Sequence, residues 1–377
     1  MAEPFKNFLN AGLVQAMGKH LQRACADFDR ERFEALAQDG LEALELKARC
    51  HHLCDALEQT LPRDFNAAAT LMEGALANPN GDGDSALAVR DDGLASWAVW
   101  PLTEYVARHG HHDVPRALEA LHAMTQRFSA EWAIRPFILR HPQITWDTLA
   151  RWTRDPSPHV RRLASEGSRP RLPWGTVLKP LIADPAPTLP LLRALQDDAS
   201  DYVRRSVANH LNDIAKDHPQ LVESWVREHL PAASPERRAL LRHASRTLIK
   251  QGHAGVLGVW GLGEAFAGHV RFALEPKRLA VGDSLQLTLA LASTADAPQR
   301  LVIDYAVHHV KAGGHSTPKV FKGWALELAG GETRELVKRH SMKAVTTRRY
   351  HAGLHRVEIR VNGQPMAEAA FELDVDP

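Results

Sequence analysis

Residues 155–164 read DPSPHVRRLA, and residues 198–207 read DASDYVRRSV. The two segments align without a gap at an offset of 43 positions. The aligned identities are Asp155 with Asp198, Val160 with Val203, and Arg161-Arg162 with Arg204-Arg205. A repeat of this length is typical of HEAT-type pairs of antiparallel helices, which bury their apolar faces against their neighbours. The repeat therefore predicts a helical solenoid with a concave binding surface.

Helical periodicity extends from this repeat over the first 262 residues. Leu118, Leu121, Met124 and Phe128, for example, recur at spacings of three and four residues, as on one face of an amphipathic helix. Short turns rich in Pro and Asp separate the periodic segments. Weaker copies of the repeat surround Ile134-Arg135 and occupy 239–252. We expect a HEAT-like domain over residues 1–262.

The pattern changes at residue 263. Short runs of alternating apolar and polar residues follow, including DSLQLTLAL (283–291), LVIDYAVHH (301–309) and LHRVEIRV (354–361). Turn signals such as Gly330-Gly331 and Asn362-Gly363 separate these runs. About seven strands of this kind predict an immunoglobulin-like β-sandwich over residues 263–377, although the Cys–Trp–Cys signature of antibody domains is missing. The expected fold is therefore mainly α, with a β-sandwich after the solenoid.

The total charge excludes a uniformly basic protein, because 46 Lys and Arg stand against 45 Asp and Glu. Basic residues are instead concentrated locally. Residues 131–182 hold nine Lys or Arg and four acids, and eight of the nine are Arg. Residues 336–357 hold six basic residues and no acid. Because the planar guanidinium group suits phosphate oxygens, these stretches are the candidates for binding nucleic acid.

Three carboxylates are expected to converge on the polar side of the solenoid. Glu166 lies one helical turn after Arg162, and Asp213 lies on the polar face of the matching helix in the next repeat. Glu131 belongs to the preceding repeat, where Pro136 interrupts the helical pattern. The simpler interpretation of each acid is an ion pair within its own helix, which contributes a few tenths of a kcal/mol.

Four tryptophans, Trp132, Trp146, Trp152 and Trp174, fall inside the first basic stretch. An indole can stack on a base or hold a cation against its face. Most tryptophans belong to the core. Trp132 and Trp174 are the stronger candidates for a ligand contact because they adjoin charged turns.

No motif indicates a metal or another cofactor. The segment CHHLC (50–54) places Cys50 and Cys54 one helical turn apart, but a closed metal site needs four ligands and no second half follows. The two cysteines fit better as small residues of an amphipathic helix. The glycine-rich, zinc-protease and nucleophile-elbow motifs are missing. We therefore predict no metal and no other cofactor.

The sequence indicates a cytoplasmic protein with reduced thiols. It has three cysteines, too few for a disulfide framework, and its first residues lack the features of a signal peptide. No apolar run is long enough to span a membrane. We expect a monomer.

Long blocks of this sequence resemble the AlkC branch of bacterial DNA alkylation-repair glycosylases. The blocks are GLASWAVWPLTEYVARHG (93–110), ALHAMTQRFSAEWAIRPFILRHP (120–142), HVRRLASEGSRPRLPWG (159–175), YVRRSVANHLNDIAKDHPQLV (202–222) and RHASRTLIKQG (242–252). The segment from Trp324 to Gly363 is similar to the immunoglobulin-like domain of the longer members. The resemblance covers residues 5–375.

The resemblance implies a monofunctional glycosylase that removes 3-methyladenine and 3-methylcytosine from duplex DNA without flipping the lesion. The family's acidic active-site positions fall on Glu131, Glu166 and Asp213, and a tryptophan close to the lesion falls on Trp174. A base methylated at a ring nitrogen is already cationic and leaves without protonation. The carboxylates then need only stabilise the oxocarbenium-like sugar and position water.

We expect the phosphate contacts to come from arginines of the repeats and from the basic tail. Arg135 would bind a phosphate flanking the lesion. The other expected DNA contacts are Arg161, Arg162, Arg169, Arg171, Arg204, Arg205, Arg339, Lys343, Arg348 and Arg349.

Two other functions are compatible with the repeat alone. A non-catalytic HEAT scaffold could bind DNA or a protein through the same concave face. A metal-dependent nuclease would instead use the acids as ligands, but the sequence shows no compact cluster of Asp, Glu and His.

Overall fold

A computed structural model describes residues 4–79, 90–262, 264–345 and 349–375. The chain divides into two compact units. The first comprises residues 1–217 and 233–244, and the second comprises residues 218–232 and 245–377. The expected domain boundary at residue 262 falls inside the second unit, which includes three helices that precede the strands.

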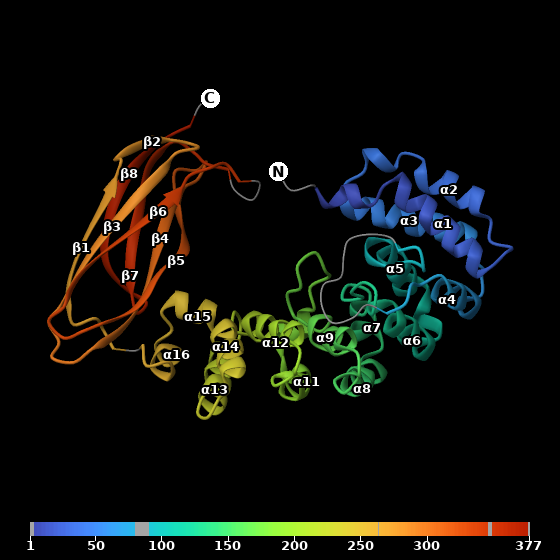
Figure 1. The fold of residues 1–377 in the computed structure, drawn as a ribbon, viewed down its shortest axis with the longest axis horizontal. Coiled ribbons are helices and arrows are strands. Elements are labelled where there is room, and N and C mark those ends of the chain that lie inside the picture. Colours follow the sequence, from blue (N-terminus) through green and yellow to red (C-terminus); the bar gives the residue numbers. More distant parts are fainter. Residues whose placement is uncertain (1–3, 80–89, 263, 346–348, 376–377) are drawn as a thin grey trace. The chain divides into compact units, whose positions relative to one another are not determined.

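The first unit is built of helices, as the periodicity predicts. In Figure 1, α5, α7, α9 and α12 follow one another in one row, and α6, α8 and α11 form a second row. The helices are α1 (Ala11–Ala24), α2 (Arg30–Gln38), α3 (Leu46–Thr60), α4 (Phe65–Gly74), α5 (Trp100–His109), α6 (Val114–Thr125), α7 (Arg135–Arg140), α8 (Pro142–Trp152), α9 (Pro158–Glu166), α10 (Lys179–Ala183), α11 (Leu189–Leu195), α12 (Asp201–Ile214) and α14 (Pro235–Ala244).

The 43-residue repeat reappears in the hydrogen bonds of the turns. In each copy the first arginine of the Arg-Arg pair closes the turn that precedes its own helix, by donating from Nη1 to two carbonyl oxygens. The contacts are Arg161 to Asp155 (2.8 Å) and Pro156 (3.0 Å), and Arg204 to Asp198 (2.6 Å) and Ala199 (2.8 Å). Helix α9 then packs against α12, and α12 packs against α14. The predicted helical solenoid is confirmed.

Pro136 begins a helix rather than bending one. It lies in the first turn of α7, which starts at Arg135. Proline is well tolerated there because the amide of this position has no partner within the helix. Glu131 therefore lies in the turn that precedes α7, not on the helix itself.

The second unit contains the β-sandwich. Its helices are α13 (Pro219–His229), α15 (Arg246–Gln251) and α16 (Ala254–Val259), and α13 packs against α16. The strands are β1 (Gly268–Glu275), β2 (Arg278–Ala280), β3 (Ser284–Ser293), β4 (Gln299–Val310), β5 (Ser316–Leu328), β6 (Thr333–Ser341), β7 (Gly353–Val361) and β8 (Gln364–Asp374). They form a sheet of order β1-β3-β6 and a sheet of order β2-β8-β7-β4-β5.

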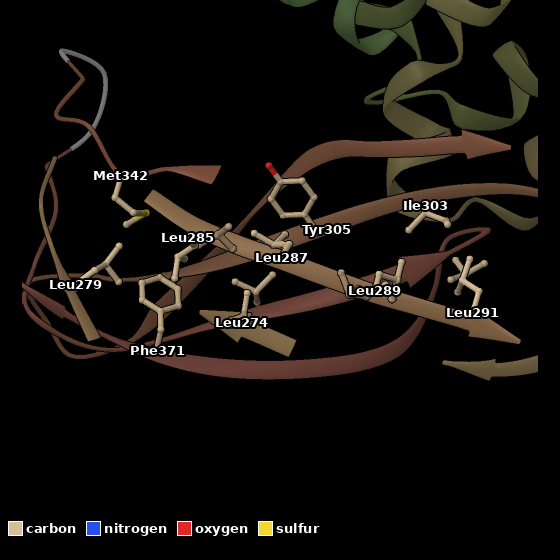
Figure 2. Close-up of a cluster of buried hydrophobic side chains, with 14 of the residues drawn as sticks. Leu274, Leu279, Leu285, Leu287, Leu289, Leu291, Ile303, Tyr305, Met342 and Phe371 are labelled. Atoms are coloured by element: carbon tan, nitrogen blue, oxygen red, sulfur yellow. The ribbon is translucent and has the colours of Figure 1, made fainter. Parts of the chain in front are cut away.

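Alternating leucines of β3 fill the space between the two sheets. Leu285, Leu287, Leu289 and Leu291 are all fully buried. Figure 2 shows them with side chains of other strands, among them Phe371 of β8. Because side chains alternate across a strand, one apolar residue in every two is enough to make this core.

No helix among the described residues is long and apolar enough to span a membrane.

Candidate active site

Two carboxylates from different repeats share one arginine. Arg162 Nη1 donates to Glu131 Oε2 at 2.6 Å, and Arg162 Nη2 lies 3.4 Å from Glu166 Oε1. Ser129 Oγ donates to the same oxygen of Glu131 at 2.8 Å. Glu131 is therefore fixed from two directions, although it lies in a turn.

A second arginine extends this network to the third carboxylate. Arg169 Nη1 donates to Glu166 Oε1 at 2.6 Å, and its Nε donates to Asp213 Oδ2 at 2.9 Å. Lys216 Nζ donates to the other oxygen of Asp213 at 2.9 Å. The structure thus brings the three predicted carboxylates together, with one guanidinium group between each neighbouring pair. We call Glu131, Arg162, Glu166, Arg169 and Asp213 the carboxylate network.

Packing of the repeats puts the network together. Glu166 is the last residue of α9, and Asp213 lies in the last turn of the adjacent helix α12. Ser206 of α12 donates from Oγ to Glu166 Oε2 at 2.6 Å. His210 Nδ1 lies 2.9 Å from the carbonyl oxygen of Ser165, within hydrogen-bonding distance. Helix α12 therefore orients both the side chain of Glu166 and the backbone beside it.

The charges of the network support one another despite burial. Burial opposes ionisation of Glu166, but the nearby guanidinium groups of Arg162 and Arg169 outweigh it and hold the pKa of Glu166 below its ordinary value. Burial likewise acts against the charge of Arg162, while Glu131 and Glu166 raise its pKa overall. Glu166 is thus held as a carboxylate at neutral pH. It presents fixed negative charge rather than a proton.

Trp174 is an exposed aromatic residue with an unusual backbone. Its exposed fraction is 57%, and its φ of +62° lies in the left-handed region. Such a conformation costs a bulky residue of order 1 kcal/mol or more and is enriched at functional sites. The indole stacks on Trp132, with ring centroids 6.2 Å apart and an interplanar angle of 26°. Trp132 Nε1 in turn donates to the carbonyl oxygen of Pro173 at 3.1 Å.

Arg135 supports the loop that carries Trp174 instead of facing DNA. It is completely buried, and its guanidinium group donates to carbonyl oxygens of Thr176 at 2.6 Å and of Gly167 and Arg169 at 2.8 Å each. Burial, followed by the charge of Arg169, lowers the pKa of Arg135 to about 10. A side chain with no exposed surface has none to offer a phosphate, so the expected phosphate contact of Arg135 does not fit its surroundings.

Comparison with known proteins identifies the family. A chain of the solved structure of Pseudomonas fluorescens alkylpurine DNA glycosylase AlkC bound to DNA containing an abasic site analog is 36% identical. The match covers 99% of this chain and 100% of that one, with a TM-score of 0.90. This chain belongs to the AlkC family. The resemblance predicted from the sequence is confirmed.

Other relatives of this AlkC-family chain agree. The uncharacterized protein YhaZ of Bacillus subtilis is 34% identical over 374 residues, which are 98% of this chain and 99% of YhaZ. A family model described as DNA alkylation repair enzyme matches residues 119–248, and one described as the C-terminal Ig-like domain of YhaZ matches residues 269–375. The first match includes all five residues of the carboxylate network.

Most of the expected DNA-contacting arginines of the repeats are engaged within the AlkC-like fold. Arg162 and Arg169 belong to the carboxylate network, and Arg161 and Arg204 close turns, so these four have structural partners that a phosphate would have to displace. Arg171 makes two hydrogen bonds to Asp217, at 2.9 and 3.0 Å, yet remains exposed. Arg205 is also exposed, and its Nε lies 3.2 Å from Asp201 Oδ2 of its own helix.

The expected DNA contacts of the sandwich lie on the surface where the structure describes them. Arg339 is an exposed residue of β6. Lys343 and Arg349 are exposed in the connection from β6 to β7. Arg348 lies outside the described residues.

The cysteines of α3 are not arranged as metal ligands. Cys50 and Cys54 are buried, and burial raises the pKa of both thiols. Within the described parts of the chain, no group of three or more His, Cys, Asp and Glu side chains could hold a metal ion.

The sequence reasoning missed Ser206 and His210. In the repeat alignment Ser206 corresponds to Leu163, a core residue of the first copy. A hydroxyl that replaces an apolar side chain at a core position needs a buried partner. The presence of Ser206 where the first copy has Leu163 therefore indicates a polar group inside the solenoid.

Proposed function

We propose that this AlkC-family chain is a monofunctional DNA glycosylase that hydrolyses the N-glycosidic bond of 3-methyladenine and 3-methylcytosine in duplex DNA. The observation that carries the proposal is the carboxylate network, in which three acidic side chains from three successive segments of the solenoid are joined through two arginines. Positive charge develops on the deoxyribose as the cationic base leaves, and fixed negative charge stabilises that transition state.

Glu131 is the carboxylate best placed to face the reacting sugar. The exposed fraction of its side chain is 12%, against 7% for Glu166 and 3% for Asp213. Glu131 therefore stabilises the oxocarbenium-like sugar and positions the attacking water. Glu166 and Asp213 add negative charge behind it. Glu166 also holds Arg162, which orients Glu131, and Asp213 holds Arg169.

Trp174 presents its indole to the lesion nucleotide. An exposed aromatic face attracts a methylated base through its quadrupole as well as by apolar contact. The lesion stays in the duplex, because its own charge and instability distinguish it and no energy needs to be spent on unstacking. The reaction uses no metal or other cofactor.

The phosphate contacts of the proposed complex come from exposed cations. In the helical unit these are Arg171 and Arg205. In the sandwich the exposed candidates are Arg339, Lys343 and Arg349. Arg348, which lies outside the described residues, stays a candidate from the sequence alone. The protein acts as a monomer on duplex DNA in the cytoplasm.

Release of bases from methylated DNA tests this function. Duplex DNA treated with a methylating agent is incubated with the protein, and the released bases are separated and identified by mass. We expect free 3-methyladenine and 3-methylcytosine, with abasic sites and no direct strand cuts. Binding without released bases would favour the non-catalytic scaffold. Strand cuts that disappear on chelation of divalent metals would favour the nuclease.

A further inference from the structure

The helical unit contains a groove that shares no residue with the carboxylate network. It is a groove of about 430 Å³ between α3, α5, α7 and the loop that carries Trp174. Its lining includes Lys47, Trp100, Arg108, Trp132, Arg140 and Trp174. Trp132 directly follows Glu131 in the chain, so one lining residue of the groove adjoins the carboxylate proposed to face the sugar.

A row of indoles forms the wall of this groove. The ring centroids of Trp100 and Trp132 are 4.8 Å apart, and those of Trp132 and Trp174 are 6.2 Å apart. Phe5 packs edge-on against Trp174 at a centroid distance of 6.2 Å. The exposed indole is therefore held between two rings. A rigid aromatic surface of this kind suits the flat faces and edges of nucleotides.

Of the three cations in the groove, Arg108 is paired with carboxylates of the described residues, whereas Lys47 and Arg140 are not. Arg108 donates to carboxylate oxygens of Asp55, Glu58 and Glu104 at 2.6 to 3.1 Å. Lys47 and Arg140 are exposed. Among the acids in the described ranges, none lies within ion-pair distance of either side chain. Two positive charges at the edge of an aromatic groove remain available for an anion.

We propose that this groove binds the nucleotide that flanks the lesion, with its sugar against Trp132 and its phosphate between Lys47 and Arg140. Trp174, at the end of the row, faces the lesion. The inference rests on the proposed function, because the lesion nucleotide must lie at Glu131 for its neighbour to reach Trp132. Neighbouring phosphates of one strand are separated by about 3.4 Å along the helix axis, so the strand passes from one site to the other within a nucleotide or two. The mixture of aromatic wall and unpaired cations matches a nucleotide unit.

The salt dependence of DNA binding tests this site. Affinity for duplex DNA containing a tetrahydrofuran abasic site is measured by fluorescence anisotropy between about 50 and 200 mM salt. We expect Lys47→Gln and Arg140→Gln each to weaken binding and to reduce the slope of log K against log salt by about 0.9, the value for one lost phosphate contact on duplex DNA. Trp174→Ala should weaken binding with an unchanged slope, because it removes no charge.

Matched controls use exposed cations outside the groove. Lys19→Gln in α1 and Arg154→Gln after α8 remove the same charges from other parts of the helical unit and should leave the slope unchanged. Equal slopes for wild type, Lys47→Gln and Arg140→Gln would overturn the inference. Equal losses in the controls would also overturn it, because the effect would then be one of net charge alone.

A competition experiment separates a DNA strand from a free nucleotide. Deoxyadenosine monophosphate should fail to displace the abasic duplex at concentrations well above the Kd of the duplex. Displacement that depends on Lys47 and Arg140 would assign the groove to a free nucleotide and overturn the strand assignment. These measurements do not depend on catalysis, so a wild-type protein that releases no base would refute the proposed function while the slopes still decide whether the groove binds DNA.

Discussion

The two clearest copies of the repeat share their architecture and differ in their chemistry. Arg161 and Arg204 make the same contacts to the turn before their own helices. The next residue behaves differently in each copy. The side chain of Arg162 is 16% exposed and joins Glu131 to Glu166, whereas that of Arg205 is 59% exposed and pairs with Asp201 on its own helix.

The acids of the two copies differ in the same way. Glu166 aligns with Asn209, whose Oδ1 lies 2.8 Å from His243 Nε2 of α14. The second copy instead supplies Asp213, one helical turn later. Positions whose contacts are the same in both copies build the solenoid, and positions whose contacts differ build the site. Each prediction below tests one such position.

We expect the largest effect at the aligned positions Glu166 and Asn209, where the first copy has an acid and the second has an amide. Glu166→Gln should reduce the single-turnover rate of base release at least about 100-fold, because a fixed charge near the developing cation is lost. Asn209→Ala, at the matching position, should remain within a few fold of wild type. Equal rates for the two variants would show that the difference between the copies has no catalytic meaning.

His210 occurs in the second copy only, because the aligned residue of the first copy is Gly167. We expect His210 to make the free energy of unfolding depend on pH. Burial lowers the pKa of His210 to about 4, against about 6.5 for an unfolded chain. The unfolded chain therefore takes up the proton first as pH falls. The contribution of neutral His210 to the free energy of unfolding is fully present above about pH 6.5. About 3 kcal/mol of it is lost as the pH falls to about 4.

Urea unfolding followed by circular dichroism measures this contribution. Between about pH 7 and pH 4.5, the wild type should lose more unfolding free energy than His210→Asn, which has no imidazole to titrate. Parallel pH profiles for the two proteins would contradict the assignment.

The shared arginines should matter for stability. Arg161→Ala removes the hydrogen bonds to the turn and leaves the nearly buried carboxylate of Asp198 without its guanidinium partner. We expect a loss of about 2 kcal/mol of unfolding free energy, typical of charged hydrogen bonds in a partly buried setting. Arg204→Ala should show a smaller loss in the same denaturation assay, because Arg204 makes the same turn bonds but its ion pair is with the exposed Asp201. A loss in one copy alone would mean that the two turns are not equivalent.

Arg205 should give the smallest effect. Its exposed pair with Asp201 contributes no more than about 0.5 kcal/mol, so Arg205→Ala should leave stability nearly unchanged. Affinity for DNA should fall a few fold, whatever the sequence, if Arg205 contacts a phosphate. Titration with duplexes of different sequence measures this. A destabilisation as large as that of Arg161→Ala would show that the second arginine of the Arg-Arg pair stabilises the fold as much as the first arginine does.

The sequence was enough to predict the solenoid and the sandwich, because both follow from periodicity. Strand β6 gives a weaker pattern, because charged residues, Arg334 and Lys338, occupy two of the four positions on its less exposed face and only His340 is buried along it. A strand at the edge of a sheet gives a weak alternating pattern.

The site was predictable in its acids but not in its arginines. Helical geometry and the family resemblance located Glu131, Glu166 and Asp213. The sequence does not distinguish an arginine that binds phosphate from one that binds a carbonyl group. It therefore predicts a DNA contact for Arg135. The role of an arginine depends on whether its side chain is buried. The loop from Gly167 to Thr176 covers Arg135, and no local sequence pattern predicts this contact.

The most direct test of the central claim is the single-turnover release of 3-methyladenine by wild type and Glu131→Gln, with the affinity of each protein for abasic duplex DNA. Glutamine keeps the size of the side chain and a hydrogen bond to Arg162 but removes the charge. The account predicts a rate at least about 100-fold lower with affinity within a few fold of wild type. An unchanged rate would contradict it, because the carboxylate nearest the surface would then not act on the sugar.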